Sequence, residues 1–324
     1  MVKVVYEGKS YELPPGETLL DGLLCQGLMV PHGCKTGSCQ SCLLKCTKGP
    51  IPSKSQQGLK PAHQINNYFL ACQCVPDQDM QVTLPNLAAD RFKATIKGLR
   101  ILTSGIMEVS LKPYCEMNYR AGQFIHLFHP DGSSRSYSLA SVPGLDDGLI
   151  LHVREYPHGK LSSWIHHTLK PGDEVTVSEA LGDCFYLPGN PDQTLLLIGT
   201  GTGLAPLLGI IKDALQQGHQ GAIHLFHGAK ETNGLYLRDE LNQIHRIHPQ
   251  FSYTGTVSSS PAPIPSDITR GRASDIALAT HPDLKGWRIY LCGNPDMVKA
   301  TQVQAFLANA SLNDIHADPF EIQF

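Results

Sequence analysis

Two short runs at the start of the chain, Val2–Tyr6 and Lys9–Leu13, place apolar residues at every second position, on either side of Gly8. A period of two is typical of strands with one buried face, so the two runs predict a β-hairpin. The leucine spacing then becomes helical over residues 17–26. The buried side of this expected helix carries Leu19, Leu20, Leu23 and Leu24.

A second set of strands follows residues 86–91, where the apolar alternation stops before it starts again at Phe92. Strand-like runs cover residues 93–102, 106–111 and 123–128, and glycine and proline turns separate them. Short strands at this spacing indicate a small antiparallel β-barrel.

The last part of the chain mixes strands with helices. A fully apolar strand at residues 195–198 leads into a glycine-rich turn and a helix over 207–215. Further elements are expected at 223–227 (strand), 236–245 (helix), 251–257 (strand) and 288–291 (strand). This order favours a doubly wound α/β unit around a parallel sheet.

These breaks predict a multidomain protein of 324 residues. The expected domains are an α+β unit at 1–88, an antiparallel β-barrel at 92–190 and a parallel-sheet α/β unit at 194–324. Residues 86–91 are the expected linker.

Charge and composition narrow the function classes. A net charge of −3, without a basic run interleaved with aromatics, argues against nucleic-acid binding. No apolar run reaches the roughly 18 to 20 residues of a membrane span. Ten cysteines and no signal-peptide pattern favour a cytoplasmic location. The oligomeric state is left open.

Three cysteines form a C-x4-C-x2-C run, and a fourth cysteine follows 30 positions later. This is the spacing of a plant-type [2Fe-2S] site, in which each iron takes two thiolates. Gly33 and Gly37 let the loop fold back without Cβ clashes. The predicted cluster ligands are Cys34, Cys39, Cys42 and Cys72.

Two other arrangements of these thiols compete with this ligand set. A zinc site built from Cys39, Cys42, Cys72 and Cys74 matches paired short spacings but leaves Cys34 unexplained. Cys74 also competes with Cys72 for the fourth iron position, because alternating strand geometry would put both side chains on one face.

On these residues, positions 1 to about 88 resemble a plant-type ferredoxin domain. The resemblance implies the α+β β-grasp fold and carries the family's four cluster ligands onto the four predicted cysteines.

A second resemblance lies in the expected barrel. Arg135, Tyr137 and Ser138 form an R-x-Y-S sequence, which resembles the flavin signature of the ferredoxin-NADP reductase family. A cation suits a pyrophosphate, an aromatic ring packs on a flavin, and a hydroxyl can bond the flavin edge. The following Gly159-Lys160-Leu161-Ser162 looks like the family's helix N-terminus under the FAD pyrophosphate. The implied FAD contacts are Arg135, Tyr137, Ser138, Gly159, Lys160, Leu161 and Ser162.

The glycine-rich turn after the first strand of the α/β unit suits a diphosphate, because backbone amides and a helix N-terminus point toward it. Gly201, Thr202, Gly203 and Pro206 belong to a sequence of the GTGxAP form that is typical of the same reductase family. We expect Pro206 at the first helical position, where its missing N–H leaves no partner unpaired.

The segment from Cys292 to Met297 resembles the family's C-G-x-P-x-M motif and includes Gly293. The resemblance implies that Cys292 lies at the nicotinamide and that Cys292 and Ser138 are catalytic. The family also covers its flavin with a C-terminal aromatic residue. Phe320, which we include among the cofactor contacts, and Phe324 are both candidates.

Together the resemblances imply an NAD(P)H-dependent oxidoreductase that passes electrons from nicotinamide through FAD to a [2Fe-2S] cluster and on to an acceptor protein. The flavin is needed because NAD(P)H gives two electrons at once and the cluster takes one. NADH is favoured over NADPH, since Ser258, Ser259 and Ser260 follow a strand with no adjacent arginine for a 2′-phosphate.

The nearest groups by resemblance are reductase components of bacterial multicomponent oxygenases of the methane, phenol or benzoate type and CDP-6-deoxy-glucoseen reductases. An oxygenase is therefore the expected partner. A free-standing flavin or deoxysugar reductase, and a non-catalytic redox sensor or adaptor, are the alternatives.

Overall fold

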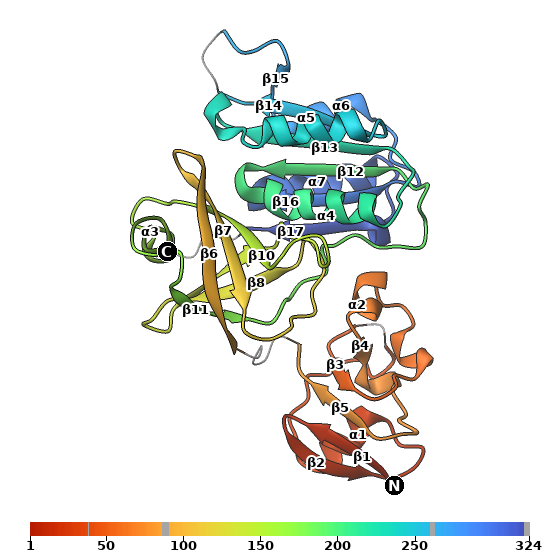
Figure 1. Ribbon diagram of the computed structural model, residues 1–324. Helices are drawn as coiled ribbons and strands as arrows, with labels where there is room; N and C mark the ends of the chain where they lie inside the picture. Colours follow the sequence, from red (N-terminus) through yellow and green to blue (C-terminus); the bar gives the residue numbers. More distant parts are fainter. Residues whose placement is uncertain (38, 86–90, 260–262, 321–324) are drawn as a thin grey trace. The chain divides into compact units, whose positions relative to one another are not determined.

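The computed structural model describes residues 1–37, 39–85, 91–259 and 263–320 (Figure 1). The chain divides into two compact units, Met1–Ala89 and Asp90–Phe324. The expected linker at 86–91 lies outside the described residues except for residue 91. Among the described residues, no helix has the length and apolar character needed to cross a bilayer.

The first unit is a five-stranded sheet in the order β2-β1-β5-β3-β4, with one main helix, α1 (Leu19–Cys25). The strands are β1 (Val2–Tyr6), β2 (Lys9–Leu13), β3 (Leu43–Lys48), β4 (Tyr68–Leu70) and β5 (Met80–Thr83). The hairpin has the predicted bounds because its alternation matches the pleat, with Val2 opposite Leu13 and Tyr6 opposite Lys9. The Thr18 side chain caps α1 by accepting from the amide of Asp21.

Two short helical segments lie between β3 and β4. They are a 3-10 turn, η1 (Ser53–Gln56), and helix α2 (Pro61–Ile65). Pro61 occupies the first helical position of α2, where its missing N–H costs nothing. A third short turn, η2 (Ala71–Gln73), follows β4 where the strand pattern was expected to continue.

The second unit begins with an antiparallel sheet in the order β10-β7-β6-β11-β8-β9. A bridge between Leu139 and Leu151 joins the two outer strands, which closes the sheet into the expected barrel. Helix α3 (Lys160–His167) follows β10. The strands are β6 (Arg91–Thr103), β7 (Ile106–Pro113), β8 (Phe124–Phe128), β9 (Ser134–Ser138), β10 (Leu149–Arg154) and β11 (Glu174–Ser178).

The rest of this unit is a parallel sheet in the order β15-β14-β13-β12-β16-β17. Its strands are β12 (Leu195–Thr200), β13 (Ile223–Ala229), β14 (Phe251–Val257), β15 (Ile268–Arg270), β16 (Arg288–Gly293) and β17 (Ile315–Pro319). The chain runs outward from β12 to β15 and then returns to β16 on the other side of β12. Strand order thus reverses between β12 and β16, and the carboxyl ends of these strands form the switch point where ligands of such sheets bind.

Helices cover both faces of the parallel sheet (Figure 1). Side chains of α4 (Leu204–Gln216) and α5 (Arg238–Ile247) belong to one buried cluster, while those of α6 (Ala273–Thr280) and α7 (Pro295–Leu307) belong to another. The doubly wound architecture is therefore confirmed. Helix α4 begins at Leu204, so Pro206 is its third residue and the expectation of a first helical position was wrong.

Candidate functional site

Cys34 and Cys39 are exposed on the loop between α1 and β3. Backbone amides are directed at both sulfurs. The amides of Thr36 and Cys39 lie 3.3 and 3.4 Å from Cys34 Sγ, and the amide of Cys34 lies 3.4 Å from Cys39 Sγ. Hydrogen bonds from the Thr36 side chain and from backbone amides lower the pKa of Cys34 to about 6. The loop therefore favours thiolate, the form that binds iron.

The two glycines predicted for this loop occupy crowded positions. A Cβ at Gly33 would lie 3.3 Å from Cys39 Sγ, and Gly37 has a φ of +86°. Side chains at either position would disturb the sulfur-bearing loop.

Cys42 and Cys72 are buried beside each other, at the start of β3 and in η2. Burial raises the pKa of Cys42 to about 11, and hydrogen bonds link it to Cys72. The structure thus places the four predicted thiols in two pairs, 34 with 39 and 42 with 72. Among the residues described, no three His, Cys, Asp or Glu side chains are close enough to hold one metal ion. The soft donors and the amides aimed at sulfur nevertheless suit an iron–sulfur group.

The competing thiol, Cys74, has a different environment. It is fully buried, burial raises its pKa to about 12, and Ser55 forms a hydrogen bond to it. Because η2 turns the chain at residues 71–73, Cys72 and Cys74 do not follow the strand alternation expected from the sequence. Cys74 thus bonds to Ser55, whereas hydrogen bonds link Cys72 to Cys42.

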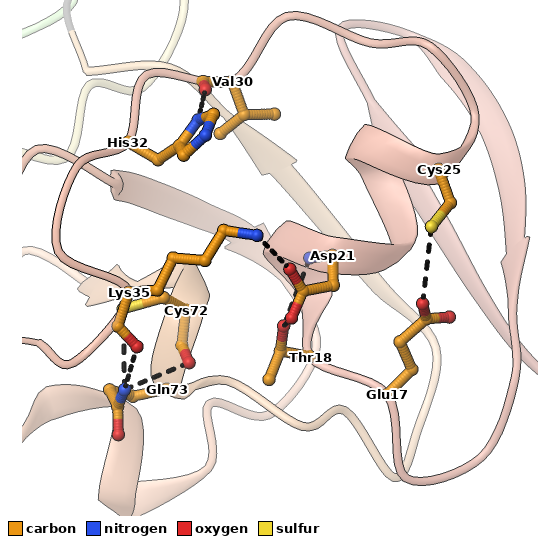
Figure 2. A network of polar contacts seen from close by, with 9 residues as sticks. All are labelled: Glu17, Thr18, Asp21, Cys25, Val30, His32, Lys35, Cys72 and Gln73. Atoms are coloured by element: carbon orange, nitrogen blue, oxygen red, sulfur yellow. Dashed lines mark hydrogen bonds and ion pairs between the residues drawn. The ribbon is translucent and has the colours of Figure 1, made fainter.

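A polar network surrounds the loop (Figure 2). Lys35 Nζ contacts Asp21 Oδ1 at 2.7 Å, and Asp21 also accepts a hydrogen bond from the Thr18 hydroxyl at 2.7 Å. The Gln73 amide reaches the carbonyl of Lys35 and the adjacent Cys72. The loop is therefore tied both to α1 and to η2.

In the second unit, three of the predicted flavin residues, Arg135, Tyr137 and Ser138, lie on β9. The Arg135 guanidinium donates to the carbonyl of Ser134 at 2.8 Å, and burial raises the pKa of Tyr137. Ser138 is buried, and its hydroxyl donates to Asp318 Oδ2 at 2.8 Å. Burial raises the pKa of Asp318 to about 6, while the Ser138 hydrogen bond opposes this shift.

Asp318 connects the two residues predicted to be catalytic. It lies opposite Cys292 in the β16–β17 register and forms a backbone hydrogen bond to it, so Ser138 of the barrel and Cys292 of the parallel sheet both contact Asp318. Burial raises the pKa of Cys292 well above its ordinary value, and its Sγ lies 3.7 Å from Cys184 Sγ. Asp318 was not predicted, because no local signal marks a residue that acts through a partner 180 positions away.

The helix expected under the pyrophosphate is α3, and Gly159 is its N-terminal cap. The Ser162 hydroxyl accepts from the amide of Tyr156 and donates to the carbonyl of Gly159, so it stabilises this turn. Leu161 is buried in the barrel core, and Lys160 forms an ion pair with Asp131. The α3 end therefore offers chiefly backbone amides to a ligand.

The diphosphate loop depends on close approach between β12 and β16. A Cβ at Gly203 would lie 2.3 Å from the carbonyl oxygen of Cys292, and a Cβ at Gly293 would lie 2.6 Å from that of Thr200. Gly201 has a φ of +57°. Thr202 belongs to the same turn, and Pro206 is buried in the first turn of α4. Only glycines allow the two strand ends to lie this close.

The C-terminal aromatic residues are only partly described. The amide of Phe320 donates to the carbonyl of Gly293 at 2.8 Å, which places Phe320 beside the Cys292 motif. Phe324 lies outside the described residues.

Two buried histidines make contacts that link distant parts of the second unit. His227 Nε2 donates to the carbonyl of Gly201 at 3.1 Å, and His152 Nδ1 lies 3.0 Å from the Tyr236 hydroxyl. Burial lowers the pKa of His227 to about 4 and that of His152 to about 3. Both are neutral at physiological pH, and together they brace the barrel and the diphosphate loop.

Comparison with known proteins adds three family matches. A 2Fe-2S iron-sulfur cluster binding domain matches residues 3–77, an oxidoreductase FAD-binding domain matches 104–186, and an oxidoreductase NAD-binding domain matches 197–303.

Relatives match along almost the whole chain. The reductase subunit of an aromatic O-demethylase from Amycolatopsis sp. is 33% identical over 332 residues, covering 97% of this chain and 96% of the relative. Reductase component 2 of a terephthalate 1,2-dioxygenase from Comamonas sp. is 29% identical, covering 96% and 94%. The crystal structure of an Amycolatopsis cytochrome P450 reductase superposes with a TM-score of 0.69 at 30% identity over 99% of both chains. The chain therefore belongs to the iron–sulfur flavoprotein reductase family, whose members join a [2Fe-2S] ferredoxin domain to FAD-binding and NAD-binding oxidoreductase domains.

Proposed function

We propose that this reductase oxidises NADH and delivers single electrons to the terminal component of an oxygenase, in the cytoplasm. The relatives are reductase components of oxygenase and demethylase systems. The observation that carries the electron-transfer proposal is the meeting of Ser138, Asp318 and Cys292 at the switch point of the parallel sheet. All ten cysteines are free of disulfides, which fits a reducing compartment.

The bound cofactors supply a two-electron oxidation of nicotinamide joined to a one-electron output at iron. The protein's task is to hold and orient them. Arg135 and the α3 amides would face the FAD pyrophosphate, and the amides from Gly201 to Gly203 would face the nicotinamide dinucleotide. The proposed FAD contacts also include Tyr137, with Gly159, Lys160, Leu161 and Ser162 at the start of α3.

Around the reacting rings, the chain offers one carboxyl, one hydroxyl and one thiol. At pH values above about 6, Asp318 is ionised and accepts a hydrogen bond from the Ser138 hydroxyl, which leaves the oxygen lone pairs of Ser138 for the flavin edge. Burial raises the pKa of Cys292, so its thiol stays neutral and would present an uncharged side chain to the nicotinamide ring. Gly293, Pro206 and Phe320 complete the proposed dinucleotide and flavin surroundings.

The preference for NADH rests on the available cations. Arg238, which could have met a 2′-phosphate, forms an ion pair with Asp267. Lys230 is exposed at the end of β13. An ion-paired arginine is a weaker partner for a phosphate, so the unphosphorylated cofactor is favoured.

We propose residues 1–88, 92–190 and 194–324 as the three domains. We propose Cys34, Cys39, Cys42 and Cys72 as the ligands of the cluster. The visible and electron paramagnetic resonance spectra of Cys72→Ser and Cys74→Ser test the ligand set. We expect Cys74→Ser to keep the rhombic signal of a reduced [2Fe-2S] cluster and Cys72→Ser to lose it. The opposite result would exchange the two cysteines.

The spectrum of the wild-type protein tests the function itself. Anaerobic NADH should bleach both flavin and iron–sulfur absorption. A protein with flavin and iron that NADH leaves unchanged would overturn the reductase proposal, and a colourless zinc protein would overturn the cluster.

A further inference from the structure

One side chain outside the predicted ligand set touches both halves of the cluster loop. Gln73, the last residue of η2, is half-buried. Its Nε2 lies 3.6 Å from Cys72 Sγ, 3.1 Å from the Cys72 carbonyl oxygen and 3.3 Å from the Lys35 carbonyl oxygen (Figure 2). The amide has two hydrogens for these three acceptors, so at least one hydrogen is shared.

The contact with the Lys35 carbonyl is a brace between separate parts of the chain. Lys35 lies in the loop that carries Cys34 and Cys39, whereas Gln73 follows Cys72 directly. Gly37 packs on the same side chain, because a Cβ there would lie 3.2 Å from Gln73 Cγ. Gln73 thus holds the exposed pair of thiols in register with the buried pair.

The contact with Cys72 Sγ has a different consequence. A protonated thiol is a weak acceptor, but a thiolate carries negative charge and accepts much more strongly. When Cys72 is an iron ligand, the Gln73 N–H therefore points at charged sulfur. Donors to ligand sulfur are among the features that set the potential of an iron–sulfur group, because they stabilise its more negative, reduced form.

We propose that Gln73 is a positioning residue of the cluster site, whose side-chain amide donates to the Cys72 thiolate and thereby raises the reduction potential of the [2Fe-2S] group. This inference rests on the proposed function, since it requires Cys72 to be a ligand. It adds a tuning residue that the ligand spacing does not reveal.

The test is a redox titration monitored by electron paramagnetic resonance, with the full chain carrying Gln73→Leu, Gln73→Glu or the control Gln81→Leu. Gln81 is an exposed glutamine on β5 of the same unit. At one applied potential, we expect Gln73→Leu to lower the reduced-to-oxidised ratio roughly 2- to 10-fold, the effect of losing one hydrogen bond. Gln73→Glu should lower it further because it adds a negative charge, and Gln81→Leu should leave it unchanged.

Other outcomes distinguish a failure of the proposed Gln73 role from a failure of the proposed cluster site. If the Gln73 variants lose thermal stability or iron but keep the wild-type potential, Gln73 is only a brace and the proposed tuning is wrong. If wild type itself shows no [2Fe-2S] signal, the proposed cluster site fails. Exchange into D2O gives a second readout. The magnetic coupling between an exchangeable proton and the reduced cluster should weaken in Gln73→Leu but not in Gln81→Leu.

Discussion

Replacing Gly203 by alanine tests whether the close approach of the Gly201–Gly203 turn to the end of β16 builds the proposed nicotinamide site. Gly203 has a φ of −57°, which alanine adopts without strain. The added methyl group would nevertheless lie 2.3 Å from the carbonyl oxygen of Cys292 and 3.0 Å from the Cα of Gly293. Both contacts are with backbone, so no side-chain rotation relieves them. Gly98 is the matched control, because a Cβ there meets nothing within 4 Å.

The size of the effect follows from the overlap. An ordinary carbon–oxygen contact is about 3.3 Å, so the end of β16 has to retreat by about 1 Å. Overpacking of this kind costs about 1–3 kcal/mol. In a unit the size of Asp90–Phe324 this lowers the melting temperature by roughly 2 to 12 °C. Displacing a reacting group by about 1 Å can also reduce the rate by up to about 100-fold.

The assay pairs thermal unfolding with NADH-dependent ferricyanide reduction, which reports electron transfer to the flavin without an oxygenase. We expect Gly203→Ala to melt lower than Gly98→Ala and to lose roughly 10- to 100-fold in kcat/KM for NADH. Equal melting temperatures and equal kcat/KM values for the two variants would refute the close-packing explanation.

Three further predictions concern charge. Asp318→Asn should raise the melting temperature more at pH 8 than at pH 5. Burial raises the pKa of Asp318 to about 6, so ionisation of this carboxyl lowers the stability of the wild type as the pH rises from about 4 through 6. Equal shifts at both pH values would contradict this. His152→Phe should flatten the loss of stability below about pH 6.5, because burial lowers the pKa of His152 to about 3 and the unfolded chain takes up the proton first. Melts at pH 7 and pH 5 check the slope. Lys230→Ala should leave kcat/KM for NADH within about twofold, since the ribose hydroxyl needs no cation; a tenfold loss in steady-state assays would place Lys230 in the NADH site.

Much of the fold could be predicted because its strands have strong local patterns. The hairpin of β1 and β2 has apolar residues at every second position, and β14 has the predicted bounds, Phe251–Val257. Four elements of the parallel-sheet region, β15, α6, α7 and β17, were not anticipated. Strand β15 has only three residues, and α6 has no strong apolar face, so neither shows a clear period.

The candidate site divides in the same way. Motifs such as R-x-Y-S identify residues by local spacing, but Asp318 gains its role only through distant Ser138. His227 likewise matters through the Gly201 carbonyl, a contact that only tertiary structure creates. The positions of Cys72 and Cys74 depended on a 3-10 turn that interrupts the strand pattern. Motif residues could therefore be predicted from local sequence, whereas contacts between residues far apart in the chain could not.

The bond between Ser138 and Asp318 also has a consequence for biosynthesis. The two residues are 180 positions apart, so at about 5–20 residues per second the ribosome makes Asp318 roughly 10 to 40 s after Ser138. The barrel strands are all made before β17. Ser138 therefore lacks its carboxylate partner until the last strand has been made, so this part of the proposed flavin site is completed late in synthesis.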